Sequence, residues 1–252
     1  MSTPKTPKPR AKPKAAAKAS AKSPAKTSAK APAKTAKPKT KAVKRVAKKL
    51  VEADQAATHA LAAKRRNPLV RVAGWLSEAA DQPPLITASL GTLAIGLVTK
   101  RADLARGGAR MLASHLLATG AKLAIKHQID RTRPATALDS GKSRFEAGDT
   151  GGHDEKSFPS GHTAGAVAVA LAASEDIDGA ALPAALAAGA VAAMQAPAGN
   201  HYLTDVVVGG AVGWAAEAVV SAVFDRWEPQ VEAAITGHPL PTGEGQPSKA
   251  AR

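Results

Sequence analysis

The chain has 252 residues and a formal net charge of +15, but its basic residues are unevenly distributed. Residues 1–50 contain 17 of the 35 Lys and Arg residues and no Asp or Glu, so the remaining 18 basic residues face 20 acidic ones and the rest of the chain is nearly neutral. There is no cysteine, which excludes disulfides, thiol catalysis and cysteine-ligated metals, and an aromatic content of 3% argues against base-stacking platforms for single-stranded nucleic acid.

The first segment, residues 1–42, consists almost entirely of Lys, Ala, Pro, Ser and Thr. Such a segment has too little apolar surface to offset the entropy lost on ordering, so a disordered basic tail is predicted. No apolar stretch follows its early positive charges, so it does not resemble a secretory signal. Three interpretations remain open: a solvated linker, an arm that contacts anionic lipid, and an arm that contacts nucleic acid.

Residues 43–83 form a helical lead-in of two amphipathic segments. In residues 43–66, apolar side chains recur at helical intervals among Lys and Ala, which is typical of a helix lying on a membrane surface. Asn67-Pro68 marks a new start. The second segment covers about residues 68–80 and ends before Pro83-Pro84.

Residues 84–226 are predicted to form a helical bundle. Its expected helices cover residues 85–99, 107–125, about 163–174, about 179–196 and about 203–224, with a polar loop at about 135–157. No strand-like alternation is visible, so the predicted class is all-α, with about five to six core helices. Gly209 and Gly213 have the spacing that allows helices to approach closely in a membrane. Residues 227–252 are expected to be a helix end and a flexible tail.

The bundle is expected to be membrane-embedded, with a soluble bundle as the alternative. Residues 85–99 would span about 22 Å, less than the roughly 30 Å of a hydrocarbon core. The positive-inside rule favours a cytoplasmic tail and also a cytoplasmic loop around Lys100, Arg101 and Arg106. Both conditions hold only if residues 68–82 cross or re-enter the membrane.

Lys126 and Arg133 follow an apolar segment and precede Pro134. Their spacing corresponds to two helical turns if the helix persists, and Pro134 favours a helix end. Near a helix end, Arg133 offers a planar fork and Lys126 a point charge for a phosphate group.

Ser160, Gly161 and His162 precede the apolar segment that begins at residue 163. Ser160 is well placed as an N-cap, the free N–H groups and the helix dipole form an anion site, and Gly161 allows close backbone approach. His162 in the first turn could donate a proton to a departing alkoxide.

His201 and Asp205 are four residues apart, which on a helix would place them on one face. A carboxylate on one imidazole nitrogen fixes the tautomer and exposes the other nitrogen as a nucleophile. Taken singly, such features are usually caps, surface histidines or solvated helix ends. Their occurrence together, between apolar helices, predicts a site that binds and attacks a phosphate without a metal or other cofactor.

At this point the residues resemble the type 2 phosphatidic acid phosphatase / vanadium-dependent haloperoxidase superfamily, in its membrane-associated phosphatase branch. Its signature is Lys, six residues and Arg-Pro; then Pro-Ser-Gly-His; then Ser-Arg, five residues, His, three residues and Asp. The chain matches at Lys126 and Arg133-Pro134, at Pro159-Ser160-Gly161-His162, and at His201 and Asp205. The resemblance covers roughly residues 84–224.

The resemblance implies a phosphohistidine intermediate on His201, oriented by Asp205, with His162 as general acid. It also implies that the phosphoryl oxygens are held by Lys126, Arg133, Ser160 and Gly161. Members of this family need no metal for phosphatase action, and many are multi-pass membrane proteins that act on lipid phosphates or diphosphates.

One position departs from the signature. Met194 and Gln195 occupy the place of Ser-Arg, so the second arginine of the family is absent. Gln195 can donate hydrogen bonds to the substrate but carries no charge, and losing a charge-assisted contact costs about 1.5–3 kcal/mol. Two hypotheses follow: the enzyme is slower or favours a less charged substrate, or Arg131 or Arg144 fills the gap.

The leading hypothesis is a metal-independent phosphatase acting on a lipid phosphate or diphosphate, as a multi-pass protein of a bacterial inner (cytoplasmic) membrane. A soluble acid phosphatase of the same superfamily is one alternative. A catalytically weakened bundle that displays a nucleic-acid-binding or lipid-binding tail is another. A haloperoxidase is disfavoured because the missing arginine would weaken vanadate binding.

Overall fold

The computed structural model of the chain describes residues 38–149 and 152–236. Most of the basic tail predicted at residues 1–42, and the C-terminal segment from Gly237 onward, lie outside the described residues. Residues 38–43 and 227–236 are described only as parts of helices.

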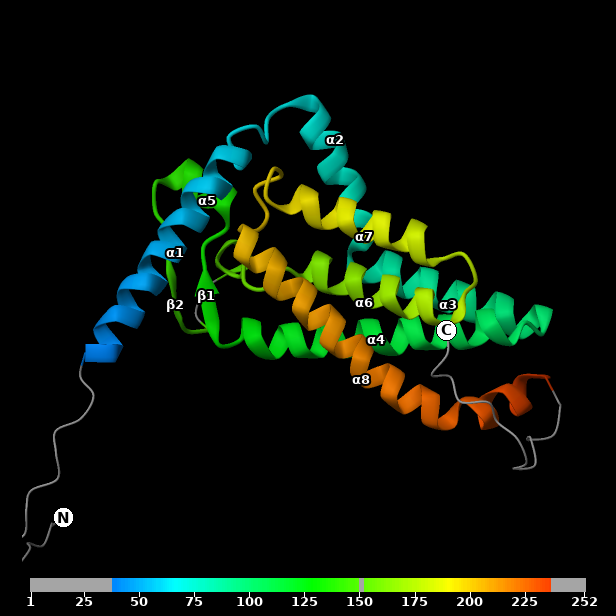
Figure 1. Cartoon of the computed structure of the whole chain (residues 1–252). Coiled ribbons are helices and arrows are strands. Elements are labelled where there is room, and N and C mark those ends of the chain that lie inside the picture. The colour runs from blue at the N-terminus through cyan, green and yellow to red at the C-terminus, as the bar shows by residue number, and fades with distance from the viewer. Residues whose placement is uncertain (1–37, 150–151, 237–252) are drawn as a thin grey trace, which may run out of the picture. The chain divides into compact units, whose positions relative to one another are not determined.

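The described residues are mainly helical, as predicted. The helices are α1 (Pro38–Ala62), α2 (Pro68–Ser77), α3 (Gln82–Thr99), α4 (Ala102–Lys126), α5 (Pro134–Ser140), α6 (Gly161–Asp176), α7 (Ala181–Gln195) and α8 (Leu203–Thr236) (Figure 1). Two single turns of 3-10 helix, η1 (Glu78–Ala80) and η2 (His153–Glu155), and two strands, β1 (Ile129–Arg131) and β2 (Phe145–Ala147), complete them. The predicted all-α bundle is therefore confirmed.

The predicted loop at residues 135–157 is more structured than expected, because it contains α5, β2 and η2. Strand β2 pairs antiparallel with β1, and Asp130 lies opposite Glu146. Each strand has three residues, too few to display the alternation by which strands are recognised in a sequence. The helix expected to approach Arg133 ends earlier, at Lys126, and Arg133 becomes the N-cap of α5.

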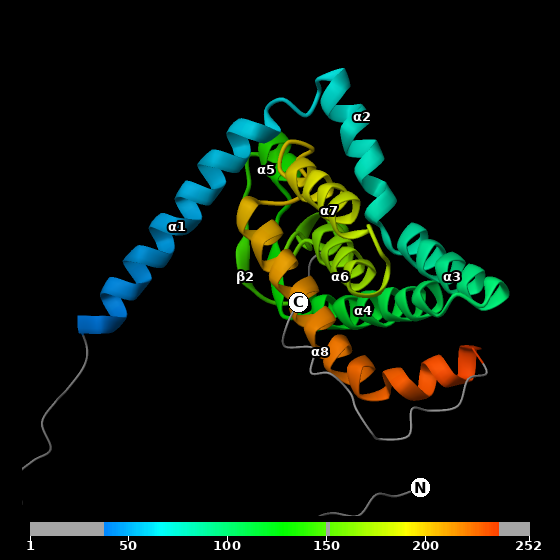
Figure 2. The same cartoon turned by 45° about the vertical axis from the view of Figure 1, so that its right-hand side comes forward.

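Helix α6 lies at the centre of the bundle and packs against α3, α4, α7 and α8 (Figure 2). Small residues allow this, because they let helix backbones approach closely. A Cβ on Gly209 of α8 would lie 2.5 Å from the carbonyl oxygen of Ser160, and one on Gly213 would lie 2.4 Å from that of Ala164. The close approach predicted from the spacing of these two glycines is confirmed.

We expect Gly209→Ala to destabilise the protein by about 1–3 kcal/mol, the usual cost of overpacking a core. The added methyl group would push α8 away from α6. Gly210→Ala is the matched control, because a Cβ there meets only a methyl carbon of Thr163 at 3.9 Å. Alanine favours a helix over glycine, so the control is expected to be neutral or stabilising. Denaturant unfolding of both variants in detergent measures the difference, and equal stabilities would contradict the packing argument.

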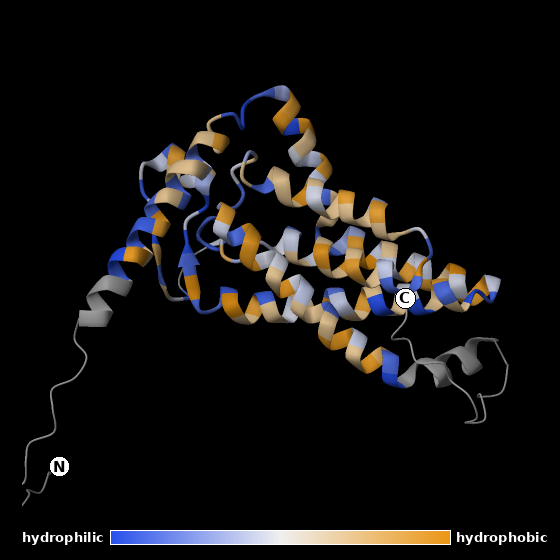
Figure 3. Cartoon of the chain, in the orientation of Figure 1, coloured by the Kyte–Doolittle hydropathy of each residue, from blue (hydrophilic) through white to orange (hydrophobic). Residues whose placement is uncertain are grey.

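Within the described part of the chain, two helices are long and apolar enough to cross a membrane, namely α3 and residues Leu203–Arg226 of α8. A core helix of a soluble protein passes the same test, but such a helix is mostly buried. Only 11% of α3 and 28% of the α8 segment are buried. Figure 3 shows hydrophobic residues along the outer helices and hydrophilic ones around β1. Large apolar side chains are exposed at Leu90, Ile95, Val98, Leu182, Leu186, Val207, Trp214, Val219 and Val223. This exposure suggests association with a membrane.

The positive-inside rule placed both the basic tail and the loop around Lys100 in the cytoplasm, which would require residues 68–82 to cross or re-enter the membrane. The structure does not provide a crossing there. Helix α2 has 10 residues, so it is about 15 Å long, half of a hydrocarbon core. If α3 crosses a membrane, the basic residues of α1 and the turn at Lys100-Arg101 therefore lie on opposite sides of it. The rule can be satisfied at only one of the two places.

Candidate active site

The three sequence clusters meet at one end of the bundle. Lys126 is the last residue of α4, Ser160 caps the start of α6, and His201 lies two residues before α8. The backbone N–H of Ser160 donates to the carbonyl oxygen of Asp205 at 3.0 Å, which ties the second cluster to the third. The ring centroids of His162 and His201 are 6.3 Å apart. The two predicted histidines therefore lie close together, with their rings at 62° to each other.

His201 has the environment of a neutral nucleophile. Its side chain is buried, and its Nδ1 lies 2.6 Å from the carbonyl oxygen of Ser157. A carbonyl oxygen only accepts, so Nδ1 carries the proton and Nε2 keeps its lone pair. Burial, assisted by the positive charge of Arg133, lowers the pKa of His201 to about 4. The ring is therefore neutral at ordinary pH, with Nε2 available for attack.

Asp205 orients this histidine less directly than the sequence suggested. His201 precedes α8, so the two residues do not share a helix face, and Nδ1 lies 3.9 Å from Oδ2 of Asp205. Oδ2 instead accepts from the backbone N–H of Tyr202 at 2.9 Å and from the hydroxyl of Ser157 at 2.5 Å. A carboxylate that reaches back in this way caps a helix start. Asp205 thus holds Ser157, whose carbonyl group holds His201.

The start of α6 has the geometry expected of an anion site. Ser160 is the N-cap, and its hydroxyl accepts from the N–H of Thr163. The amides of Gly161 and His162, in the first turn, have no intrahelical acceptor, and none in the rest of the described chain. These amides and the positive end of the helix dipole favour a phosphoryl oxygen there. The amide of Ser160 is not available, because it donates to Asp205.

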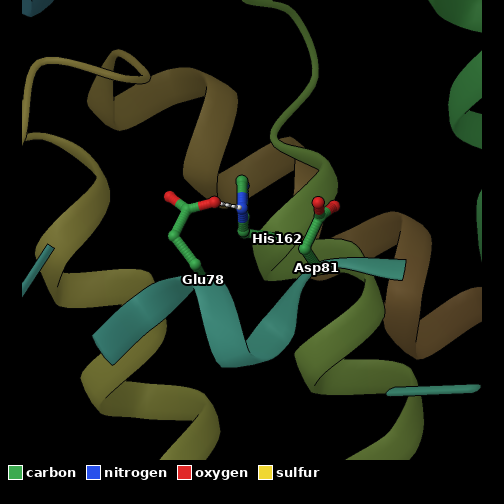
Figure 4. A group of neighbouring side chains, drawn as sticks. All are labelled: Glu78, Asp81 and His162. Carbon is green, nitrogen blue, oxygen red and sulfur yellow. Dashed lines mark hydrogen bonds and ion pairs between the residues drawn. The ribbon is translucent and has the colours of Figure 1, made fainter. Parts of the chain in front are cut away.

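His162 lies beside two acidic residues of the segment before α3 (Figure 4). Its Nε2 is 3.3 Å from Oε2 of Glu78. Ligand atoms of Glu78, Asp81 and His162 lie within 4.8 Å of one another, a spacing that a metal ion could bridge. Both carboxylates are exposed, however, and exposed acidic groups often lie together without an ion.

Two cations line the site from the other side. Arg133 donates from Nη1 to the carbonyl oxygen of Asn200 at 3.1 Å, one residue before His201. Lys126 donates from Nζ to the carbonyl oxygen of Lys156. Burial, followed by repulsion from Arg133, lowers the pKa of Lys126 to about 7, and burial also lowers the pKa of Arg133. An anion bound between them would relieve this repulsion.

Gln195 is not placed to replace the missing arginine. Its side chain is fully buried, and Nε2 donates to the carbonyl oxygen of Val191 at 3.0 Å and approaches the hydroxyl of Ser77 at 3.5 Å. The remaining polar atom, Oε1, is a buried acceptor without a partner and would repel a phosphate. The main chain of Gln195 does contribute, since its carbonyl oxygen accepts from the N–H groups of Asn200 and His201.

The two arginines suggested as substitutes are engaged elsewhere. Arg131 is buried, forms ion pairs with Asp54 and Asp205, and stacks 3.9 Å from the ring centroid of Tyr202. The guanidinium of Arg144 is shared among three carboxylates, those of Asp130, Glu146 and Glu155. Neither arginine directs an uncompensated charge at the space between the histidines.

Sequence reasoning missed the contribution of α1. Asp54 accepts from Arg131 at 2.6 Å and from the N–H of Thr204 at 3.0 Å, and Thr58 accepts from the N–H of Leu203 at 3.2 Å. These bonds satisfy the first amides of α8, which have no partner within the helix. The residues involved are up to 150 positions apart. No local pattern could have revealed the pairing.

Ser157 was also missed, although it lies three residues before the Ser160 N-cap. Its carbonyl oxygen accepts a hydrogen bond from Nδ1 of His201, and its hydroxyl donates one to Asp205. Its position beside Pro159-Ser160-Gly161-His162 was the only available signal. A serine in a polar loop is too common for that signal to predict a role.

Comparisons with known proteins identify a family and a similar fold. The model of the PAP2 superfamily matches residues 107–229. Among solved structures, the fold is similar to that of a transmembrane PAP2-type phosphatidylglycerolphosphate phosphatase from Bacillus subtilis, with a TM-score of 0.50 and 18% sequence identity. That match covers 70% of this chain and 87% of the other. No curated protein sequence matches the chain.

The matched segment contains each signature residue predicted from the sequence, from Lys126 to Asp205. The prediction of a phosphoric ester hydrolase is confirmed by this match, and the similar solved structure confirms the helical fold. Residues 107–229 therefore form a phosphatase domain that belongs to the PAP2 superfamily.

Proposed function

We propose that the protein is a metal-independent phosphatase that hydrolyses a lipid phosphate or lipid diphosphate through a phosphohistidine intermediate on His201. The observation that carries this proposal is the Nε2 lone pair of a buried, neutral histidine, whose Nδ1 proton is held by Ser157. His162 lies beside it at a ring-centroid distance of 6.3 Å, close enough for both histidines to act on one phosphoryl group.

The reaction runs in two steps. In the first, Nε2 of His201 attacks phosphorus, the bond from phosphorus to the lipid oxygen breaks, and protonated His162 gives its proton to that oxygen. In the second, neutral His162 removes a proton from water, which attacks phosphorus and releases phosphate and His201. The equatorial oxygens are held by Lys126, Arg133 and the amides at the start of α6.

The lipid nature of the substrate is supported by the apolar exterior of the bundle. The exposed faces of α3 and α8 suit lipid, and the similar structure from Bacillus subtilis is described as transmembrane and as acting on phosphatidylglycerolphosphate. We propose a multi-pass protein of a bacterial inner membrane. A soluble acid phosphatase would instead remain in solution without detergent, so membrane fractionation separates the two.

Phosphate release by detergent-solubilised protein in the presence of EDTA tests the proposal. The substrates are phosphatidate, phosphatidylglycerolphosphate, a polyprenyl diphosphate and a water-soluble phosphomonoester. Release that survives EDTA and is lost in His201→Ala supports the histidine mechanism, and preference for a lipid supports the substrate class. Release that requires an added metal, or that persists in His201→Ala, would overturn the mechanism.

We expect a bell-shaped dependence of kcat/KM on pH. His201 must be neutral to attack, so activity falls as pH drops through its pKa of about 4. Lys126 must be charged to bind phosphate, so activity falls as pH rises through its pKa of about 7. In Lys126→Arg the acidic limb should stay and the alkaline limb should move up by at least about one pH unit, because arginine stays protonated. An unmoved alkaline limb would assign it to another group.

A further inference from the structure

A buried lysine that the mechanism above does not use lies beside the phosphate site. Lys122 lies one helical turn before Lys126 on α4, and its residue is 9% exposed. Its Nζ points at the first residue of α6, because a Cβ built on Gly161 would lie 2.8 Å from that nitrogen. The absence of a side chain at position 161 therefore leaves space for an ammonium group at the start of α6.

The ammonium group of Lys122 has no bonded partner among the described residues. Within residues 38–149 and 152–236, Lys122 forms neither a hydrogen bond nor an ion pair. Asp81 attracts it from beyond ion-pair distance, while its positive charge and that of Lys126 on the same helix repel each other. A buried charge without a partner is costly to a fold. A ligand of negative charge would supply the missing partner.

The surroundings of Lys122 select an anion as that ligand. Lys126 and Arg133 bring two further positive charges to the site, and the start of α6 adds the positive end of a helix dipole. Positive groups gathered in this way repel one another until a negative ligand binds. The free amide of Gly161 lies next to the ammonium group, so one oxygen of a phosphoryl group can accept from both.

The missing arginine gives this lysine a specific role. The family signature places an arginine where the chain has Gln195, and the donors of Gln195 are directed at Val191 and Ser77. We propose that Lys122 binds a phosphoryl oxygen of the substrate and supplies, from α4, the positive charge that the family carries at the position of Gln195. The inference rests on the proposed function, since it concerns the same phosphate.

Binding of inorganic phosphate tests it without turnover. Lys122→Met removes the charge and keeps most of the volume, Lys122→Arg keeps the charge, and Lys142→Met is the control at an exposed lysine. Binding is measured by calorimetry and by the rise in melting temperature with added phosphate. We expect Lys122→Met to weaken phosphate binding roughly tenfold to a hundredfold, the range for a lost charge-assisted hydrogen bond. Lys122→Arg and the control should stay within about threefold of the unmodified protein.

A second readout separates binding from a structural role. If Lys122 serves the ligand, Lys122→Met should melt at the same temperature as the unmodified protein, or higher, when phosphate is absent, because an unpaired buried charge has been removed. Phosphate binding unchanged in a folded Lys122→Met protein would overturn the proposal. Failure of both Lys122→Met and Lys122→Gln to fold, when Lys122→Arg folds, would also overturn it, by making Lys122 a structural cation.

The test distinguishes this inference from the proposed function. Phosphate binding that depends on Lys122, in a protein that releases phosphate from no substrate, would leave the inference standing and sink the proposed function. Turnover that depends on His201, with phosphate binding indifferent to Lys122, would do the reverse. In an active enzyme, Lys122→Met should also raise KM.

Discussion

His201→Ala is expected to lower phosphate release by at least about 10⁴-fold, because removing a nucleophile removes the covalent route altogether. His162→Ala should behave differently. It should slow release from a lipid phosphate by about 10²–10⁴-fold, the usual contribution of a general acid. Its first step should be nearly unaffected with an aryl phosphate, whose leaving group departs without a proton. The measurement is a time course of both products on the scale of single turnovers.

The two variants can be told apart by the intermediate. In His162→Ala the aryl phosphate should give a burst of phenol, because His162 is also needed to activate water in the second step. The burst should coincide with an acid-labile phosphate label on the protein, and His201→Ala should show neither burst nor label. His127→Ala is the control, since that histidine is exposed and contacts Asp149. A burst that survives in His201→Ala would assign the nucleophile to another residue.

Asp54→Asn is expected to destabilise the protein by about 1.5–3 kcal/mol, because it weakens the charge-assisted hydrogen bonds of a buried carboxylate. The carboxylate of Asp54 pairs with Arg131, which also pairs with Asp205, and it accepts from the amide and the hydroxyl of Thr204. Its loss should therefore also loosen the start of α8 and the loop that carries His201. We expect a lower melting temperature together with a lower kcat, even at temperatures where the protein is folded.

Glu52→Gln provides the control on the same helix. Glu52 is exposed and lies 3.7 Å from Lys48, so its loss should change stability by less than about 1 kcal/mol. Two truncations extend this comparison. Deleting residues 1–37 should leave the turnover of a soluble phosphomonoester unchanged. A chain trimmed to residues 107–229 should be unstable, because it lacks α1 and α3. Equal melting temperatures for Asp54→Asn and Glu52→Gln would contradict the claim that α1 stabilises the site.

The structure also decides how Asp205 supports His201. The spacing of four residues predicted a direct contact on one helix face, but the helix starts two residues after the histidine. Asp205 caps the start of α8 and accepts a hydrogen bond from Ser157, whose carbonyl oxygen accepts one from the imidazole ring. That Asp205 orients His201 stays a proposal, and in the structure Ser157 connects the two residues. Spacing alone could not show this, because the boundary of α8 depends on caps from α1.

The residues proposed to bind phosphate could be predicted from the sequence because their chemistry is local. Lys126, Arg133 and Ser160-Gly161-His162 each stand beside a helix end, and helix ends are marked by Pro, Ser and Gly. The role of Lys122 was not accessible in this way. In the sequence, a lysine within an apolar segment only interrupts the hydrophobic pattern. Its position against Gly161 in the structure shows where its charge points.

The sequence by itself determined the helical class, the separation of a basic tail from a neutral body, and the clusters of phosphate chemistry. These follow from composition, periodicity and residue order, which involve neighbours along the chain. Only the tertiary structure decided the short sheet, the commitment of Arg131 and Gln195 to internal contacts, and the support of α8 by α1. The reason is physical: burial and charge pairing depend on which segments meet in space, and residues such as Asp54 and Thr204 carry no local sign of their partners.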